Sequence, residues 1–209
     1  MPVLYTVIPG DYLAKIAAQF GFLDGATIWN DPANASLRQI RPNPEVLLPG
    51  DRVTIPDKER RVEERPTERR HTFVLRRSPL KLRIAIRDRV HHAEPQLTVD
   101  FTLDGQIDQP TTDGNGMFER RISPSAGSGA LTALGESVAV HVGFLDPVDS
   151  PTGWKARLNN LGYAAGPVDR STPVEERSAL EEFQCDVGLT VTGLADGTTL
   201  QKLLEKHGS

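Results

Sequence analysis

The stretch YTVIPGDYLAKIAAQFG, from Tyr5 to Gly21, predicts a strand, a tight turn and a helix in immediate succession. Its first residues favour strands, and the Pro-Gly-Asp sequence that follows is typical of a turn. Asp11 is placed to cap the helix through its carboxylate, and Gly21 is a typical helix stop. Apolar side chains recur at helical spacing between them, at Leu13, Ile16, Ala17 and Phe20.

A second turn and strand close this segment. The sequence LLPGDRVTIP supplies a Pro-Gly turn and then a strand from Arg52 to Ile55. Together with the opening stretch, the motifs YTV, GD, L..IA..FG and PGD.V.IP make residues 3–56 resemble a LysM domain. That resemblance implies a strand-helix-helix-strand fold and binding of polymers that contain N-acetylglucosamine.

The resemblance also implies where a glycan would bind. In the LysM family, glycan lies in a groove between the loop before the first helix and the loop before the last strand. Tyr12 stands where the family usually has Thr or Ser, so its ring either stacks on a sugar or fills the groove. We interpret Trp29 as a core residue and Asn30 as a cap rather than as sugar contacts. The implied glycan-binding residues are Gly10, Asp11, Tyr12, Leu13, Asn43, Pro44, Glu45 and Val46, with Leu47 beside them.

Two joints divide the chain. The sequence DKERRVEERPTERR, from Asp57 to Arg70, is almost wholly charged and buries too little apolar area to fold alone. We interpret it as a linker rather than a nucleic-acid patch, because its arginines are interleaved with glutamates. Prolines and a glycine in LDPVDSPTGW mark the second joint. We therefore predict a multi-domain α+β chain with a LysM module, a charged linker, a β-sandwich and a helical module, at residues 1–57, 58–70, 71–147 and 148–209.

The middle segment alternates apolar and polar residues with a period of two. The runs LKLRIAIR, LTVDFTLDG and SVAVHVGF each place apolar side chains on one face, and HTFVLRR and GMFERRI are weaker strand candidates. Gly-rich turns such as TTDGNGMF separate them, which favours a small antiparallel sandwich. The predicted inward set of the third run is Val138, Val140, Val142 and Phe144.

The turns of this segment make it resemble transthyretin-like or carboxypeptidase-regulatory sandwiches. Such domains often carry a DG turn and then a TDxxG turn, here Asp104-Gly105 and Thr112 to Gly116. Most members of that family are spacers or presentation modules. The resemblance therefore implies a spacer role for the middle segment.

Residues 153–207 resemble a peptidoglycan-binding-like three-helix domain, through ARLNNLGYAAGPVD and ERSALEEFQCDVGLTVTGLADGTTLQKLL. Gly162 ends the first predicted helix, and Asp196 or Thr198 caps the last. The family usually has VDGxxGPxT between its first two helices, whereas residues 168–175 lack both of those glycines. The turn must therefore be built differently. The predicted inward residues are Leu158, Leu161, Leu180, Phe183, Val187, Leu200, Leu203 and Leu204.

Motifs for catalysis are absent from the sequence. It has no HExxH zinc motif, P-loop or dinucleotide fingerprint. We expect an exposed loop pair at His91-His92, a solvent-facing His141 and a partly exposed thiol at Cys185. A calcium site at Asp104, Asp108 and Asp113 is disfavoured because the EF-hand spacing is missing. We predict a protein that is not an enzyme and uses no cofactor or metal.

Composition excludes two further classes of partner. The 209 residues carry a net charge of -4 and no long apolar run, so we expect neither nucleic-acid binding nor a membrane span. The N-terminus lacks the charged and apolar regions of a signal peptide. We therefore expect a protein that is cytoplasmic at synthesis and reaches the periplasm or a target cell by a signal-peptide-independent route.

Two functional hypotheses follow. The first is a non-catalytic protein that binds peptidoglycan or a chitin-like glycan through modules at both ends. The order of the modules also resembles accessory proteins of bacterial contractile injection machines, chiefly type VI secretion. The second hypothesis is therefore a docking adaptor that couples or loads a spike component or an effector protein and binds no glycan.

Overall fold

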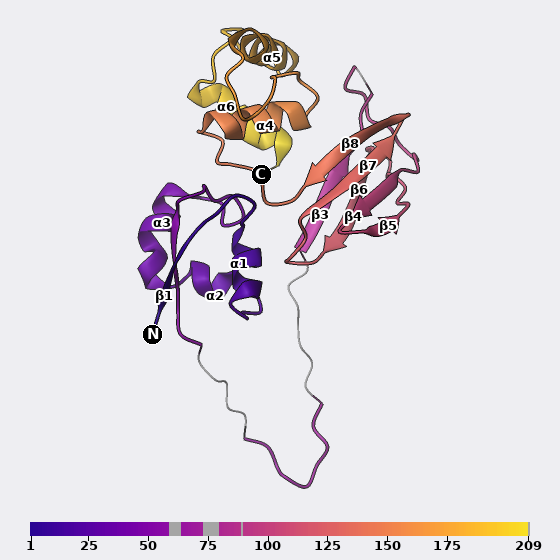
Figure 1. The fold of residues 1–209 in the computed structure, drawn as a ribbon. Coiled ribbons are helices and arrows are strands. Elements are labelled where there is room, and N and C mark those ends of the chain that lie inside the picture. Colours follow the sequence, from indigo (N-terminus) through magenta and orange to yellow (C-terminus); the bar gives the residue numbers. More distant parts are fainter. Residues whose placement is uncertain (59–63, 73–79, 89, 209) are drawn as a thin grey trace.

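The computed structural model describes residues 1–58, 64–72, 80–88 and 90–208 of the chain. It is a mixed helix-and-sheet protein (Figure 1), and these residues form three separate hydrophobic cores. We call the parts that surround them the N-terminal module (1–57), the middle module (80–147) and the C-terminal module (148–208). The described part of the charged linker, residues 64–72, contains no helix or strand, and most of the candidate strand HTFVLRR lies outside the described residues.

The N-terminal module folds as strand, helices and strand. Strands β1 (Val3–Thr6) and β2 (Arg52–Ile55) pair antiparallel, with Val3 opposite Ile55. Between them come helices α1 (Leu13–Gln19), α2 (Ala26–Trp29) and α3 (Ala35–Ile40), with the 3-10 turn η1 (Pro32–Asn34) before α3. Their shared core consists of Val7, Leu13, Ile16, Ala17, Ile28, Leu37, Leu47, Val53 and Ile55.

The start of α1 differs from the prediction. Tyr12, not Asp11, occupies the N-cap position, and its side chain makes no capping hydrogen bond. The Asp11 carboxylate instead turns back and accepts hydrogen bonds from the Tyr5 hydroxyl at 2.7 Å and the Ile8 amide at 3.1 Å. Asp11 therefore closes the turn before the helix, because a short acidic side chain readily bonds to nearby backbone. Gly21 has a φ of +72°, which confirms it as the helix stop.

A buried asparagine that the sequence analysis missed fastens the helices to the sheet. The Asn34 amide donates to the carbonyls of Ile28 and Thr54, both at 2.8 Å, and its oxygen accepts from the Thr54 amide. Trp29 packs partly buried against the core, in line with the interpretation, and Asn30 is the residue that follows α2.

The middle module contains two antiparallel sheets. Strands β3 (Leu80–Ala85) and β6 (Met117–Ile122) form one. The other has the order β5-β4-β7-β8, with β4 at Asp100–Leu103, β5 at Gln106–Asp108, β7 at Ser128–Ala133 and β8 at Glu136–His141 (Figure 1). The core between them is formed by Ile86, Val99, Phe101, Phe118 and Leu131.

The predicted alternation holds for the first two runs and only in part for the third. Apart from the half-buried Leu80, the predicted inward residues of LKLRIAIR and LTVDFTLDG are buried or packed on the core, and GMFERRI forms β6. Val140 of the third run packs on the same core. In contrast, Val138 and Phe144 are 59% and 56% exposed. The strand β8 lies at the sheet edge and ends at His141, and Gly143 follows with a φ of +85°, which breaks the extended alternation before Phe144. His141 is exposed, as expected.

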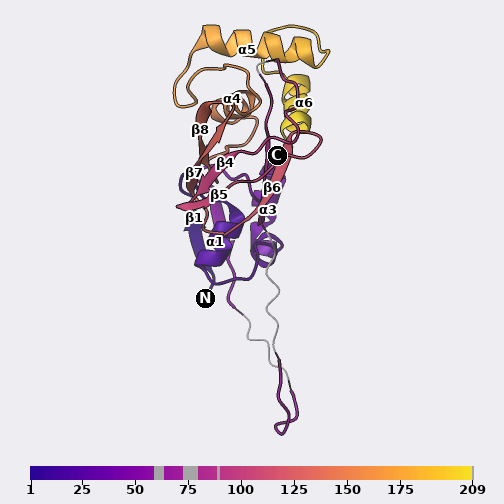
Figure 2. The ribbon, with the colours of Figure 1, turned by 90° about the vertical axis from the view of Figure 1, so that its right-hand side faces the viewer.

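The C-terminal module is a three-helix unit of α4 (Pro151–Asn160), α5 (Pro173–Asp186) and α6 (Gly197–His207). Ser150 caps α4 and Asp196 caps α6, each accepting a hydrogen bond from the amide three residues later. Gly162 has a φ of +97° and ends the first helix. The core comprises Trp154, Leu158, Tyr163, Ala165, Ala179, Leu180, Phe183 and Leu203. In both views, α5 lies at the end of the molecule opposite to the N-terminus (Figure 2).

Of the histidine pair that we expected to be exposed, one member instead contacts another module. His92 is exposed, but the His91 ring stacks on Tyr163 of the C-terminal module, with ring centroids 4.7 Å apart. The Asp88 carboxylate holds the preceding turn by accepting from the amides of Val90 and His92. His91 takes a left-handed φ of 63° in that turn, so its ring leaves the middle module.

Candidate functional site

The two loops that form the predicted glycan groove lie side by side in the structure. The Leu13 amide donates to the Pro44 carbonyl at 3.3 Å, and the Ala14 amide donates to the Glu45 carboxylate at 3.2 Å. Glu45 therefore caps α1 from the other loop, where a negative charge at a helix N-terminus is stabilising. Burial raises the pKa of the Glu45 carboxyl, and the bond from Ala14 opposes that rise.

Several predicted groove residues point inward and support the loops. Leu13 and Val46 are buried, at 1% and 8% exposure. Asn43 accepts a hydrogen bond from the Glu45 amide at 3.0 Å and so shapes the second loop. The Asp11 carboxylate is buried beside Lys15, whose ammonium lies 3.4 Å away and also donates to the Gly10 carbonyl. The side chains of these residues hold the frame of the groove.

Tyr12 is the groove residue that meets another module. Its side chain reaches the middle module, where the hydroxyl donates to the carbonyls of Pro124 at 2.9 Å and Ala126 at 3.3 Å. The residue is only 4% exposed. Burial raises the pKa of Tyr12 to about 12, and the charges of Glu45 and Asp104 add to that rise. The hydroxyl therefore stays protonated and donating throughout the physiological range.

The segment after β8 lies against Gly10 and Tyr12 of this face. The Phe144 ring lies over Gly10, so close that a methyl group on Gly10 would come within 2.8 Å of it. A methyl group on Gly143 would lie 2.6 Å from both the Tyr12 ring and the Gly10 carbonyl oxygen. A cavity of about 200 Å³ remains between the modules, lined by residues that include Pro9, Leu47, Phe144 and Asp146. The loop before α1 is thus closed off by the middle module.

The loop between α4 and α5 is built without the glycines that its family expects. Lys155 of α4 is buried and donates to the Arg170 carbonyl at 2.7 Å and the Glu176 carboxylate at 2.8 Å. The same carboxylate accepts from the Thr172 amide at 2.7 Å. These bonds replace the missing turn glycines and leave a solvent-exposed loop tip, made of Pro167, Val168, Asp169, Arg170 and Ser171.

A second loop of this module depends on one buried amide side chain. Gln184 of α5 is fully buried, and its oxygen accepts from the amides of Thr192 and Gly193. Its nitrogen donates to the Leu194 carbonyl and the Thr199 hydroxyl. Sequence analysis missed Gln184, although it precedes Cys185, which is exposed as expected. A polar residue on the inner side of an amphipathic helix is the only signal that could have revealed it.

A buried arginine connects the joint to the C-terminal module. The Arg157 guanidinium donates to the carbonyls of Asp146 at 2.7 Å and Gly153 at 2.8 Å. Burial lowers the pKa of Arg157 to about 10, against the favourable charges of Asp146 and Asp149. The Asp146 carboxylate also accepts from the Thr152 hydroxyl. The joint before α4, which contains Asp146, is therefore held against that helix.

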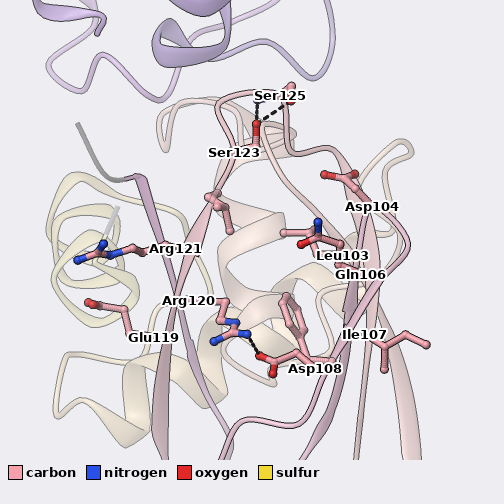
Figure 3. A pocket seen from close by; sticks show the side chains of 12 residues that line it. Leu103, Asp104, Gln106, Ile107, Asp108, Glu119, Arg120, Arg121, Ser123 and Ser125 are labelled. Carbon is pink, nitrogen blue, oxygen red and sulfur yellow. Dashed lines mark hydrogen bonds and ion pairs between the residues drawn. The ribbon is translucent and has the colours of Figure 1, made fainter. Parts of the chain in front are cut away.

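The middle module has a polar cavity of about 630 Å³ between β6 and the strands β4 and β5 (Figure 3). Figure 3 shows Arg120 pointing across it to form an ion pair with Asp108. Asp104 accepts from the Gly127 amide, and Asp113 accepts from the amides of its own turn. These aspartates are thus separately engaged, and the described residues contain no group of three or more potential metal-binding side chains.

Comparison with protein families identifies the C-terminal module. Residues 154–203 match a family described as a putative peptidoglycan binding domain, and this range covers most of the three-helix unit. Comparisons with curated proteins and with solved structures gave no match. Within the described residues, no helix is long and apolar enough to span a membrane. The C-terminal module is therefore similar, over residues 154–203, to a putative peptidoglycan binding domain.

Proposed function

We propose that this protein is a non-catalytic peptidoglycan-binding protein whose C-terminal module makes the primary contact with the cell wall. The match of residues 154–203 to a peptidoglycan-binding family is the observation that carries the proposal. The three-helix fold supports it. The exposed loop tip at residues 167–171 is the surface we assign to the glycan, because Lys155 and Glu176 hold it rigidly while its side chains face solvent.

We assign the N-terminal module to the LysM type, with a second glycan-binding groove formed by Gly10, Asp11, Tyr12, Leu13, Asn43, Pro44, Glu45 and Val46. The two paired strands that enclose a run of helices support this assignment, although three α-helices and a 3-10 turn stand where the family pattern has two helices. The proximity of the two loops supports it as well. Two weak sites on one chain gain avidity because the second binding event is intramolecular. The middle module then acts as the spacer that sets their separation.

The setting we propose is a bacterial contractile injection or type VI secretion apparatus, which would deliver the protein to the periplasm or a target cell. A protein-docking adaptor is the second candidate function. The observation that favours it is the position of Tyr12, which contacts the middle module and leaves its ring unavailable to a sugar in this arrangement. In that case, the N-terminal module serves assembly and only the C-terminal module meets the wall.

Co-sedimentation of the full chain with insoluble peptidoglycan sacculi tests the proposal. We expect saturable binding that weakens in Arg170→Ala and Val168→Ala, which alter the exposed loop tip without touching Lys155. Lys206→Ala is the matched control, because it removes an exposed cation from α6 on the same module. Failure of the unchanged chain to sediment with sacculi would eliminate the cell-wall function and leave the adaptor.

A further inference from the structure

The face that holds the predicted glycan groove already has an occupant. Tyr12 inserts between the modules and donates to two backbone carbonyls, those of Pro124 and Ala126. On the other side, Phe144 covers Gly10. Both contacts come from the turns that flank β7 and β8, so one edge of the middle module covers the loop before α1.

The fit between these surfaces is close enough to exclude a sugar. Gly143 has no room for even a methyl group, because the Tyr12 ring and the Gly10 carbonyl oxygen both lie 2.6 Å from that position. The cavity that remains, about 200 Å³, is below the roughly 300 Å³ at which small-molecule pockets begin. A polymer chain cannot lie along Gly10 and Tyr12 while the middle module stays in place.

We propose that the middle module is a competitive occupant of the N-terminal groove, so that glycan binds there only when the two modules separate. This inference rests on the proposed glycan binding by the N-terminal module. The apparent affinity of the groove is then reduced by the fraction of molecules that are open. The charged linker leaves the modules joined after they separate, since Asp57 to Arg70 form a hydrophilic tether.

The contact has the composition expected of a separable interface. It combines hydroxyl-to-carbonyl hydrogen bonds between uncharged groups with the half-exposed Phe144. Interfaces between domains of one chain resemble transient protein interfaces, and relative motion is expected unless they are large and apolar. The hydrophobic core of each module is complete without the contact, because none of the three cores includes Tyr12 or Phe144.

A titration of the full chain with a soluble oligomer of N-acetylglucosamine tests the competition. Gly143→Ala inserts a methyl group into the contact, and Phe144→Ala removes the ring over Gly10, yet neither residue belongs to the groove. We expect both variants to bind the oligomer more tightly than the unchanged chain, by roughly threefold or more. Val138→Ala is the matched control, since it shortens an exposed apolar side chain of β8 and should leave the affinity unchanged.

A double-mutant cycle measures the contact without any glycan. In the full chain, Gly143→Ala should lower the unfolding midpoint more when Tyr12 is present than in the Tyr12→Ala background, because the ring that the methyl group meets is then gone. The backbone strain at Gly143 is the same in both backgrounds and cancels. The close approach of the methyl group to the Gly10 carbonyl oxygen is likewise present in both backgrounds. Equal shifts would therefore show that the segment after β8 does not meet the Tyr12 ring, and would overturn the proposal.

The possible results separate this proposal from the proposed function. Equal oligomer affinities in the unchanged chain and both opened variants would overturn the competition while leaving glycan binding intact. No oligomer binding by any variant would overturn both the competition and the glycan role of the N-terminal module. Sacculus binding through the C-terminal loop tip is measured separately, and it would stand in either case.

Discussion

In the N-terminal module the loop before α1 lies against the middle module, whereas in the C-terminal module the loop between α4 and α5 is open to solvent. The first loop has a glycine at the position where its turn needs a positive φ, with Gly10 at +85°, and yet Tyr12 beside it is 4% exposed. The second loop has lost the glycines expected of its family, and yet it keeps an exposed tip because Lys155 and Glu176 hold it from inside.

This difference shows that the backbone conformation of a loop and its accessibility to a ligand are separate properties, although a sequence motif is often taken to report both. A motif reports how the backbone turns, since glycines and caps act locally. Whether a loop is available to a ligand depends on what the rest of the chain places on it. Here the loop with the more regular motif is the covered one, and the loop with the altered motif is the accessible one.

Among the variants that test this comparison, removal of the buried ammonium group of Lys155 should lower stability the most. Lys155→Met leaves the Glu176 carboxylate and the Arg170 carbonyl without their shared donor in a site where the lysine side chain is 2% exposed. We expect the free energy of unfolding of the C-terminal module to fall by about 2 kcal/mol. The loss is smaller than for a fully buried pair, because the Glu176 side chain is 19% exposed and keeps its hydrogen bond from the Thr172 amide. Denaturant unfolding followed by Trp154 fluorescence measures it in a Trp29→Phe background, which removes the other tryptophan of the chain.

A surface pair on the same module provides the control for that measurement. Lys202→Met breaks the ion pair between Lys202 and Glu205, whose side chains are 35% and 53% exposed, respectively. The free energy of unfolding should fall by less than about 1 kcal/mol. Similar losses for the two lysine variants would contradict the structural role assigned to Lys155. Sacculus binding should decline in Lys155→Met and persist in Lys202→Met.

Alkaline pH should loosen both ends of the molecule. The pKa values of Tyr5, Tyr12 and Tyr163 are each raised from 10 to about 12, with burial as the largest cause. The unfolded chain therefore releases these protons first, and stability that is complete below pH 10 declines as the pH rises toward 12. Unfolding midpoints measured across this range should fall progressively. A flat profile would show that the three hydroxyls are not buried donors.

Removal of the Tyr12 hydroxyl tests the contact between the N-terminal groove and the middle module. Tyr12→Phe keeps the ring but removes the donor to Pro124 and Ala126, and should cost about 1 kcal/mol. Part of the stability loss between pH 10 and 12 should disappear with it. The matched variant Tyr163→Phe removes the bond to Asp186 within the C-terminal module. Increased amide hydrogen exchange at residues 125–127 in Tyr12→Phe, but not in Tyr163→Phe, would locate the effect at the groove.

The smallest effect on stability is expected at the exposed loop tip. Arg170→Ala removes an exposed side chain and keeps the backbone carbonyl that accepts from Lys155. Its free energy of unfolding should stay within about 0.5 kcal/mol of the unchanged chain. Weaker binding to sacculi would then report lost glycan contact rather than lost folding. Full retention on sacculi would move the binding surface of this module elsewhere.

Local signals determined most of the secondary structure. Leu13, Ile16 and Ala17 form one face of a helix because they recur at helical spacing, and the strand Arg52–Ile55 has the predicted bounds. Gly21 and Gly162 stop helices because each adopts a positive φ. All of these depend on neighbours within a few residues, so the order of residues is sufficient to predict them.

Contacts between distant segments decided the rest. The cap on α1 comes from Glu45 instead of Asp11, and Asn34 and Gln184 fasten segments that no short window connects. Val138 stands opposite the core residue Leu131 and is exposed because β8 is an edge strand. Phe144 leaves the alternation because Gly143 turns the chain before it.

The sequence by itself predicted many of the helices and strands and several of the turns between them, and residues 154–203 match a putative peptidoglycan binding domain. Only the tertiary structure decided which loops face solvent. Tyr12 hydrogen-bonds to carbonyls more than a hundred residues away in sequence, and His91 stacks on a ring of another module. Burial and hydrogen bonding between modules depend on how the chain brings distant residues together, and side-chain periodicity carries no information about that.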